Sequence, residues 1–363
     1  MRDMGQLKRL FLDEAPMIDV RAEVEFAQGA FPGAVNIPIL NDEERHLVGI
    51  SYRSDGPDAA EKLGYELVAG DEKAQRLERW IDFVDQNPGT FLYCFRGGKR
   101  SQIACEWLKD VGTKVTRIPG GYKSMRRFLL DQFQNIPRLL VVSGKTGVGK
   151  TELLSLLDGS VNLEHLAHHR GSAFGRHPDP QPSQISFENA VAINFLKFTA
   201  GRSQGSLYVE DEGRLIGRIQ LPQALQTAMK MAPIILLEDS LENRVCRIYQ
   251  EYIVCQWQEY SLRFSDTAQV HFSEYLYTAI DAIRKRLGGV AHAEVRKLLQ
   301  NALESQKSGD FEPHKTWIKP LLQDYYDPMY SYQLEKKADR IVHRGSLKEI
   351  LAWSNEPTGF THG

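Results

Sequence analysis

The chain has 363 residues, of which 42% are hydrophobic and 25% charged, and its formal net charge is −2 at pH 7. This composition is ordinary for a globular protein, and the length is sufficient for two domains or more. A net charge near zero excludes a global attraction to nucleic acid, so any RNA contact must use local basic patches.

The sequence shows no signal for a membrane or an export route. No apolar run approaches the roughly 18 residues of a membrane-spanning helix. The first residues, MRDMGQLKRLFLDEAP, lack the apolar centre of a signal peptide. Four scattered cysteines without a C-x-x-C pair argue against a disulfide framework or a zinc site. We therefore expect a cytoplasmic protein.

The first 135 residues alternate between strands and helices, which is typical of a parallel α/β sheet. The expected elements are a strand–helix–turn–strand run at 18–38, a mostly helical stretch at 59–87, strands at 91–93 and 115–118, and a helix at 122–133. Arg126 and Arg127 are expected to be exposed on the last helix. Functional residues of parallel sheets lie at the carboxyl ends of strands.

The segment Phe91–Ser101, FLYCFRGGKRS, is the most informative part of this domain. Cys94 follows a short apolar strand, and Arg100 closes a C-x5-R turn before a helix. The two glycines of the turn let backbone amides point inward, and the helix start adds its positive dipole end. Arg96, Lys99 and Arg100 add cations. This setting favours a reactive thiolate that faces an anion over a buried structural cysteine.

Three motifs of this domain resemble rhodanese-like sulfurtransferase domains: DVR-x-x-x-E-F at Asp19–Phe26, G-A-x-N-I-P at Gly33–Pro38, and the Cys94 loop. The common rhodanese loop is C-x-x-G-x-R. Here Lys99 takes the expected arginine position, and Arg100 lies one residue later. Because the C-x5-R length is also that of related cysteine phosphatases, sulfur transfer and phosphate chemistry both stay open for this domain.

A linker near 135–138 leads to a second motif. The apolar strand 139–142 is followed directly by GKTGVGKT and a helix at 152–157, which is the strand–loop–helix context of the G-x-x-x-x-G-K-[ST] phosphate-binding loop. Its amides cradle phosphates, Lys150 reaches them, and the hydroxyl of Thr151 can hold Mg²⁺. The predicted phosphate- or diphosphate-binding residues are Gly144, Lys145, Thr146, Gly147, Val148, Gly149, Lys150 and Thr151.

Acidic residues follow the next predicted strand, 207–209. An apolar strand that enters the acidic run Glu210-Asp211-Glu212, downstream of a phosphate-binding loop, is the place for a residue that orients Mg²⁺ or acts as a general acid or base, with Asp211 and Glu210 as the candidates. A helix at 184–198 and a strand at 233–237 are also expected. The N-K-x-D motif of guanine recognition is missing, so a GTPase is disfavoured.

The histidines near His169 do not predict a metal site, because no cysteine or carboxylate cluster accompanies them. A basic loop beside the phosphates, with Arg170, is the preferred interpretation. We expect no permanently bound cofactor and no metal other than Mg²⁺ held with Thr151.

From residue 241 onward the pattern becomes helical, with exposed tyrosines at Tyr325–Gln333 and a basic run at Arg284–Arg286. The expected architecture is therefore a rhodanese-like parallel-sheet domain at 1–135, a P-loop NTPase-like α/β domain at 138–240, and a helical C-terminal region at 241–363 packed on the P-loop domain. A solvated helical face is preferred to an RNA surface for the C-terminal basic and aromatic residues.

Together with HRGSAFG at His169–Gly175, EDEGRLIG at Glu210–Gly217 and YYDPMY at Tyr325–Tyr330, this pair of domains resembles the bacterial tRNA 2-selenouridine synthases over nearly the whole chain. The resemblance implies a tRNA with 2-thiouridine at the wobble position of the anticodon loop. It also implies an S-geranyl-2-thiouridine intermediate made from geranyl diphosphate, and selenophosphate as the selenium donor.

On this resemblance, the phosphate-binding loop holds the diphosphate of geranyl diphosphate and need not hydrolyse ATP. Cys94 accepts or presents selenium as a selenopersulfide, while Arg96, Lys99 and Arg100 bind selenophosphate. The candidate contacts to RNA or another anion are Arg126, Arg127 and Arg170.

Two other classes remain open on the residues alone. The first is a P-loop ATPase or kinase with a rhodanese-like regulatory or sulfur-carrier domain. The second is a sulfur-carrier or phosphatase-like enzyme that needs Cys94 alone, with the P-loop as a structural anion site. A non-catalytic RNA-binding adaptor is the least favoured, because it has no use for two anion-handling sites.

Overall fold

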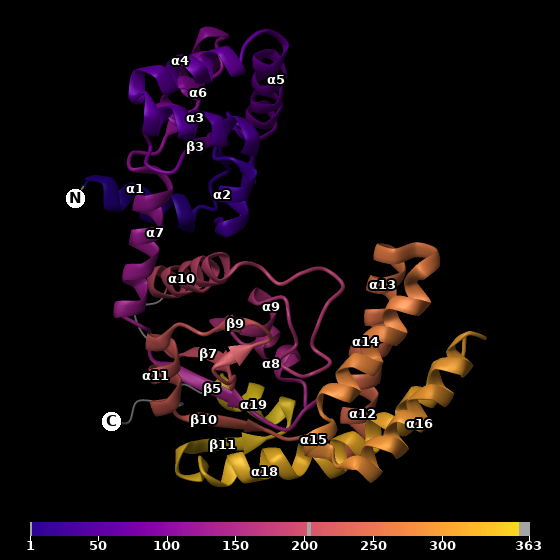
Figure 1. Ribbon diagram of the computed structural model, residues 1–363. Helices are drawn as coiled ribbons and strands as arrows, with labels where there is room; N and C mark the ends of the chain where they lie inside the picture. Colours follow the sequence, from indigo (N-terminus) through magenta and orange to yellow (C-terminus); the bar gives the residue numbers. More distant parts are fainter. Residues whose placement is uncertain (1, 202–204, 356–363) are drawn as a thin grey trace. The chain divides into compact units, whose positions relative to one another are not determined.

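The computed structural model describes residues 2–201 and 205–355 (Figure 1). The chain divides into two compact units. The first unit comprises Met1–Asn135 and Ser183–Ser203, and the second comprises Ile136–Pro182 and Gln204–Gly363. This grouping differs from the expected ranges 1–135, 138–240 and 241–363, because one helix of the expected P-loop domain belongs to the first unit.

The first unit is built around four short parallel strands in the order β2-β1-β3-β4. The strands are β1 (Met17–Asp19), β2 (Ala34–Asn36), β3 (Phe91–Tyr93) and β4 (Thr116–Arg117). The helices are α1 (Arg2–Leu12), α2 (Glu23–Gln28), α3 (Asp42–Ser54), α4 (Pro57–Leu67), α5 (Gly70–Gln86), α6 (Lys99–Asp110), α7 (Gly121–Asp131) and α10 (Gln184–Gly201).

Two apolar clusters form the core of this unit. One contains Ile18, Trp80, Leu92 and Leu108, and it is covered by α5 and α6. The other joins α1, α7 and α10 through residues such as Phe11, Met125 and Ile193. The helix α10 is apolar around most of its circumference, and it is buried because two other helices cover it.

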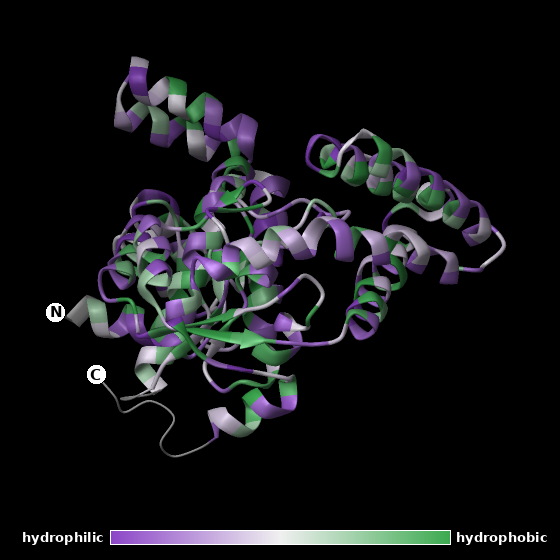
Figure 2. Ribbon diagram, turned by 90° about the horizontal axis from the view of Figure 1, so that it is seen from below, coloured by the Kyte–Doolittle hydropathy of each residue, from purple (hydrophilic) through white to green (hydrophobic). Residues whose placement is uncertain are grey.

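The second unit contains five parallel strands in the order β11-β10-β5-β7-β6, with the strand of the phosphate-binding loop at the centre. Figure 2 shows the strand arrows as predominantly hydrophobic. The strands are β5 (Leu139–Ser143), β6 (Ser160–Val161), β7 (Leu207–Glu210), β10 (Ile234–Leu237) and β11 (Ile341–Gly345), beside the two-stranded pair β8 (Leu215–Ile216) and β9 (Ile219–Gln220).

Helices flank this sheet and form a separate apolar cluster in the C-terminal part. The helices are α8 (Lys150–Leu156), α9 (Leu163–Leu166), α11 (Gln223–Met231), α12 (Leu241–Tyr249), α13 (Gln256–Phe264), α14 (Ala268–Ala282), α15 (Arg284–Leu287), α16 (Gly289–Gln306), α17 (Lys315–Pro320), α18 (Asp327–Glu335) and α19 (Leu347–Ser354). Gln250–Cys255 and Leu321–Tyr326 are π-helical turns.

The predicted fold class is confirmed: both sheets are parallel and a helical part follows the second. Two details differ. The stretch expected to be mostly helical at 59–87 consists of two helices that are interrupted at Val68 and Ala69. The region expected to be helical after residue 241 returns to the sheet as β11, which pairs with β10.

None of the described helices has the length and apolarity to cross a membrane.

Candidate functional site

The first candidate site lies at the carboxyl end of β3, which is an inner strand of the four-stranded sheet. Cys94 follows this strand and only 3% of its surface is exposed. Its thiol donates a hydrogen bond to the hydroxyl of Ser101 (Sγ–Oγ 3.3 Å), which donates to the carbonyl of Gly98 (3.0 Å). The predicted strand, loop and helix are confirmed. Ser101 is a partner of the thiol that the sequence reasoning did not select, although it directly follows the C-x5-R motif.

A second glycine turn holds the Cys94 loop in shape. Gly121 has a φ of +54°, and a Cβ atom there would lie 2.2 Å from the carbonyl oxygen of Cys94. The amide of Tyr122 donates to that oxygen (2.9 Å), and the amide of Lys123 donates to the carbonyl of Phe95 (3.0 Å). The start of α7 therefore packs backbone to backbone against the loop, and only glycine permits this approach.

The three predicted cations around Cys94 have different surroundings. Lys99 forms an ion pair with Glu61 (2.9 Å), and Arg100 forms two hydrogen bonds with Glu25 (2.5 and 3.1 Å). Burial disfavours the charge of Arg100, but the pairing with Glu25 outweighs it and raises the pKa of Arg100. Within residues 2–201 and 205–355, Arg96 is exposed and has no side-chain hydrogen bond or ion pair. An incoming anion therefore meets Arg96 free and must compete with carboxylates for Lys99 and Arg100.

Of the two arginines expected to be exposed on α7, one is not. Arg126 is ion-paired with Glu188 and donates a hydrogen bond to Asn189 Oδ1 (2.8 Å), which leaves 15% of its side chain exposed. Both partners come from α10, which packs on α7 although it is distant in sequence. Arg127 is exposed, as expected.

The second candidate site is the phosphate-binding loop between β5 and α8. The predicted strand–loop–helix context is confirmed, with β5 ending at Ser143 and α8 beginning at Lys150. The loop is braced by α12, because Arg244 donates to the carbonyl of Thr146 (2.9 Å) and Arg247 to that of Gly147 (2.8 Å). A Cβ atom on Gly147 would lie 2.7 Å from the side chain of Ile248, so this helix also requires glycine in the loop.

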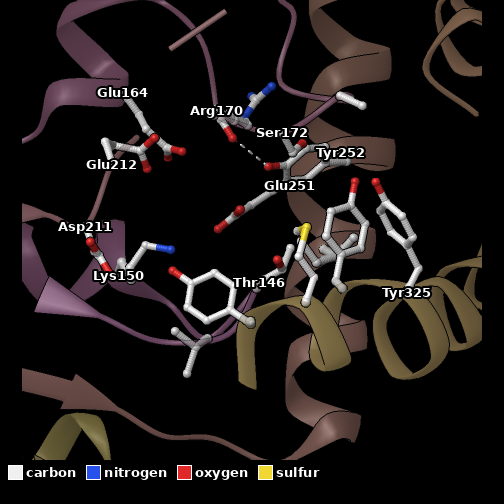
Figure 3. A pocket seen from close by; sticks show the side chains of 18 of the residues that line it. Thr146, Lys150, Glu164, Arg170, Ser172, Asp211, Glu212, Glu251, Tyr252 and Tyr325 are labelled. Atoms are coloured by element: carbon white, nitrogen blue, oxygen red, sulfur yellow. Dashed lines mark hydrogen bonds between the residues drawn. The ribbon is translucent and has the colours of Figure 1, made fainter. Parts of the chain in front are cut away.

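A pocket of about 570 Å³ opens over this loop (Figure 3). Lys150, Glu164 and Glu212 lie on one side of it, and Tyr252 and Tyr325 lie on the other. The remaining wall combines loop residues, basic groups and apolar groups, including Thr151, Arg170, Arg247, Ile248, Ile283, Arg286, Tyr326, Met329 and Tyr330. The pocket thus has one polar end at the phosphate-binding loop and one aromatic and aliphatic end.

Carboxyl groups crowd the polar end. Burial, followed by repulsion from Glu164, raises the pKa of Glu210 to about 8. Burial and the same neighbour also raise the pKa of Glu212. Burial opposes the charge of Lys150, but Tyr330 and the three carboxyl groups outweigh it and raise the pKa of Lys150. The lysine therefore stays charged, while burial favours the protonated form of Glu210.

The two acids predicted to serve Mg²⁺ or proton transfer occupy different places. Asp211 lines the pocket, but it accepts hydrogen bonds from Ser143 (2.6 Å) and Lys337 (2.7 Å). Glu210 is buried and is not among the residues that line the pocket; within the described part of the chain, one of its oxygens accepts from the amide of Glu164 (2.9 Å) and the other has no hydrogen-bond partner. Glu212, the third acid of the run that follows the predicted strand, also lines the pocket, as does Glu164, which was not predicted from the sequence.

Arg170 joins the pocket wall to the helical part. Its guanidinium contacts Gln256 and Glu259, and it lies 5.5 Å from the ring centre of Tyr252. The hydroxyl of Tyr252 donates to the carbonyl of Arg170 (3.2 Å), as the dashed line in Figure 3 shows. The π-helical turns Gln250–Cys255 and Leu321–Tyr326 contain three of the pocket's tyrosines, Tyr252, Tyr325 and Tyr326, and such turns recur at functional sites.

A wider cavity of about 890 Å³ shares the wall Gly171–Ala173 with this pocket. Arg176, Arg218, Tyr260 and Phe264 are among its lining residues. Basic and aromatic groups in one cavity suit the backbone and the unstacked bases of single-stranded RNA.

The histidines nearby do not form a metal centre. Burial and the neighbouring His177 and arginines lower the pKa of His169 to about 4, and the rings of His168 and His177 stack at 4.2 Å. Over the described ranges, no group of three or more histidine, cysteine, aspartate or glutamate side chains is arranged to hold a metal ion.

Residues 3–127 match the rhodanese-like domain family, and residues 137–359 match the family described as the tRNA 2-selenouridine synthase AAA domain. Several curated relatives are called tRNA 2-selenouridine synthase. The relative from Marinobacter nauticus is 46% identical over 361 residues, which is 98% of each chain. The relative from Shewanella halifaxensis is 46% identical and covers 96% of this chain and 97% of its own. The relative from Pseudomonas syringae pv. tomato is 47% identical and covers 96% of both. The chain therefore belongs to the tRNA 2-selenouridine synthase family.

Proposed function

We propose that this chain converts 2-thiouridine at the wobble position of tRNA to 2-selenouridine through S-geranyl-2-thiouridine, with geranyl diphosphate and selenophosphate as donors. The name of the relatives supports the overall conversion. The main structural support for a reaction with geranyl diphosphate as one of two donors is the amphipathic pocket over the phosphate-binding loop. Its polar end suits a diphosphate, and its aromatic end suits an isoprenoid chain.

In the first reaction, the sulfur of 2-thiouridine attacks C1 of geranyl diphosphate. The new C–S bond forms as the C–O bond breaks, and the electron pair leaves with the diphosphate. Lys150 and the amides of the loop Gly144–Gly149 stabilise this developing charge. Tyr252, Tyr326 and Met329 supply the apolar wall for the chain.

The donors around Thr151 fit a magnesium ion bound together with the diphosphate. The Thr151 hydroxyl lines the pocket, and the carboxylate of Asp211 becomes a ligand if it releases Lys337. Bound Mg²⁺ would neutralise charge on the leaving diphosphate. Arg247 and Arg170 remain at the pocket wall as fixed positive groups of the protein itself.

The second reaction is assigned to the Cys94 loop, where Arg96 is the first cation to meet selenophosphate. Selenium attacks C2 of the S-geranyl base, and geranyl thiol leaves with the electron pair of the C–S bond. The P–Se bond must then break with its electron pair going to selenium.

Cys94 accomplishes this last step if its thiolate accepts the phosphoryl group: an S–P bond forms as P–Se breaks, and water later releases phosphate. A selenopersulfide formed with release of phosphate would need an added two-electron oxidant. The C-x5-R loop with Ser101 at the thiol suits a phosphoryl group.

Replacing Lys150 by alanine tests the first reaction. We expect geranyl transfer to 2-thiouridine RNA to fall by two orders of magnitude or more, roughly the loss seen when one preorganised charge-stabilising donor is removed. Lys62→Ala, on the exposed face of α4, is the matched control. Unimpaired geranyl transfer by Lys150→Ala would sink the proposal for the loop.

A further inference from the structure

A second apolar pocket, of about 280 Å³, lies in the first unit between α3, α4 and α6. Its deep wall is made by buried aliphatic and aromatic side chains, including Ile39, Leu40, Val68 and Trp107. Gly64 also lines it, and a Cβ atom there would meet only Val48, at 3.9 Å. The pocket therefore has open space beside a helical glycine, and its deep wall is apolar.

This pocket adjoins the Cys94 loop. Lys99 and Arg100, the first residues of α6, line the pocket and also close the C-x5-R turn. Cys94 belongs to the same apolar cluster as Leu40, Val68 and Trp107. The thiol and the pocket are thus connected through one apolar cluster, and Lys99 and Arg100 belong both to the pocket lining and to the turn that follows Cys94.

The opening of the pocket combines aromatic and charged side chains, because Asp58 and Glu61 line it together with Lys99 and Arg100. Tyr52 and Tyr65 line it with 60% and 43% of their surfaces exposed, a large aromatic area for a surface position. Exposed apolar groups gathered at the mouth of a cavity suit an apolar ligand. A ligand that fits has an apolar chain for the interior and an anionic part that competes with Glu61 and Glu25 for Lys99 and Arg100.

We propose that this pocket binds the geranyl chain of the S-geranylated tRNA and thereby places C2 of the base at Cys94. The inference rests on the proposed function, because it requires that intermediate. The chain occupies the apolar interior, and the anionic RNA and selenophosphate remain at Lys99, Arg100 and Arg96. The departing thiol then stays in apolar surroundings as the C–S bond breaks.

This placement gives the geranyl group a second purpose. Besides making sulfur a better leaving group, the geranyl group provides apolar surface through which the first unit binds S-geranylated RNA more tightly than RNA without this group. The favourable binding free energy from burying an isoprenoid chain is proportional to its apolar area, so an RNA with a short S-alkyl group lacks most of that free energy. Selection by chain length is therefore the property that the pocket predicts.

The test uses the full-length protein and anticodon stem-loop RNA that carries either S-geranyl- or S-methyl-2-thiouridine, with selenophosphate as donor. Gly64→Leu fills the pocket from α4. Gly49→Leu places the same side chain on α3, where a Cβ atom meets nothing within 4 Å and no pocket residue is changed. The quantity measured is the ratio of kcat/KM for the S-geranyl RNA to that for the S-methyl RNA.

We expect Gly64→Leu to lower this ratio roughly tenfold or more, as differences of a few methylenes in an apolar pocket do, while Gly49→Leu keeps the wild-type ratio. An unchanged ratio in Gly64→Leu overturns the assignment of this pocket to the geranyl chain. The same result is expected if the pocket binds a partner protein instead. If Gly64→Leu loses activity on both RNAs, Ile103→Phe fills the pocket from α6, and an unchanged ratio there overturns it equally. Wild-type protein that selenates neither RNA refutes the proposed function instead.

Discussion

Replacing Glu210 by glutamine probes the acidic end of the P-loop pocket. Glu210 is fully buried, and burial followed by repulsion from Glu164 raises its pKa from 4.5 to about 8. Between pH of about 4.5 and about 8, the carboxyl group of Glu210 is therefore protonated in the native state and ionised in the unfolded chain. The free energy of unfolding therefore falls as pH rises from about 5 to about 8. At about 1.4 kcal/mol per pKa unit, ionising Glu210 costs on the order of 5 kcal/mol.

Glutamine stays neutral, and its side-chain oxygen can still accept the hydrogen bond from the Glu164 amide (2.9 Å). We expect Glu210→Gln to match wild type near pH 5 and to exceed it in stability by a few kcal/mol near pH 8. Urea unfolding of both proteins across this range measures the difference. Parallel stability profiles for the two proteins would refute the assignment of a neutral, buried Glu210.

Three other substitutions separate the two sites. Cys94→Ser should abolish selenation and spare geranyl transfer, as nucleoside analysis shows; survival of both reactions contradicts the thiolate role. Gly121→Ala places a Cβ atom against the carbonyl of Cys94, at a residue whose φ is +54°. We expect the free energy of unfolding, measured by thermal unfolding, to fall by about 1 to 3 kcal/mol. We also expect selenation to be lost while geranyl transfer is retained. Asp327→Ala leaves the buried Arg244 without its ion partner (2.6 Å). We expect the free energy of unfolding, measured with denaturant, to fall by about 3 to 5 kcal/mol, and geranyl transfer to weaken because Arg244 also holds the phosphate-binding loop. An unchanged unfolding midpoint would contradict this role of Arg244.

The strands β3 and β5, which end directly before Cys94 and Gly144, were predictable because short apolar runs stop at glycine-rich turns, and such signals are local in sequence. The assignment of α10 was not predictable. Its sequence is apolar on nearly every side, which indicates burial but not the neighbours that bury it. The strand β11 was missed because its residues, IVHRG, mix apolar and polar types, while its pairing with β10 depends on contacts across more than 100 positions.

For the candidate sites too, features that are local in sequence were predictable and contacts between distant residues were not. Residue types and spacing identified the C-x5-R turn and the phosphate-binding loop. The partners of their charged groups were not predictable, because Glu25 and Glu61 lie far from Lys99 and Arg100 in sequence. Similarly, Glu164 and Tyr330 reach Lys150 only through the fold. Motifs therefore predicted the positions of the two loops, and the three-dimensional arrangement determines which of their cations are paired with carboxylates.

The measurement that tests the central claim most directly is mass spectrometry of nucleosides from 2-thiouridine tRNA incubated with the protein, geranyl diphosphate and selenophosphate, with each donor omitted in turn. We predict S-geranyl-2-thiouridine with geranyl diphosphate alone, 2-selenouridine with both donors, and no change with selenophosphate alone. Unmodified 2-thiouridine under every condition, together with ATP turnover in a parallel assay, would contradict the account and favour a P-loop ATPase with a rhodanese-like regulatory domain.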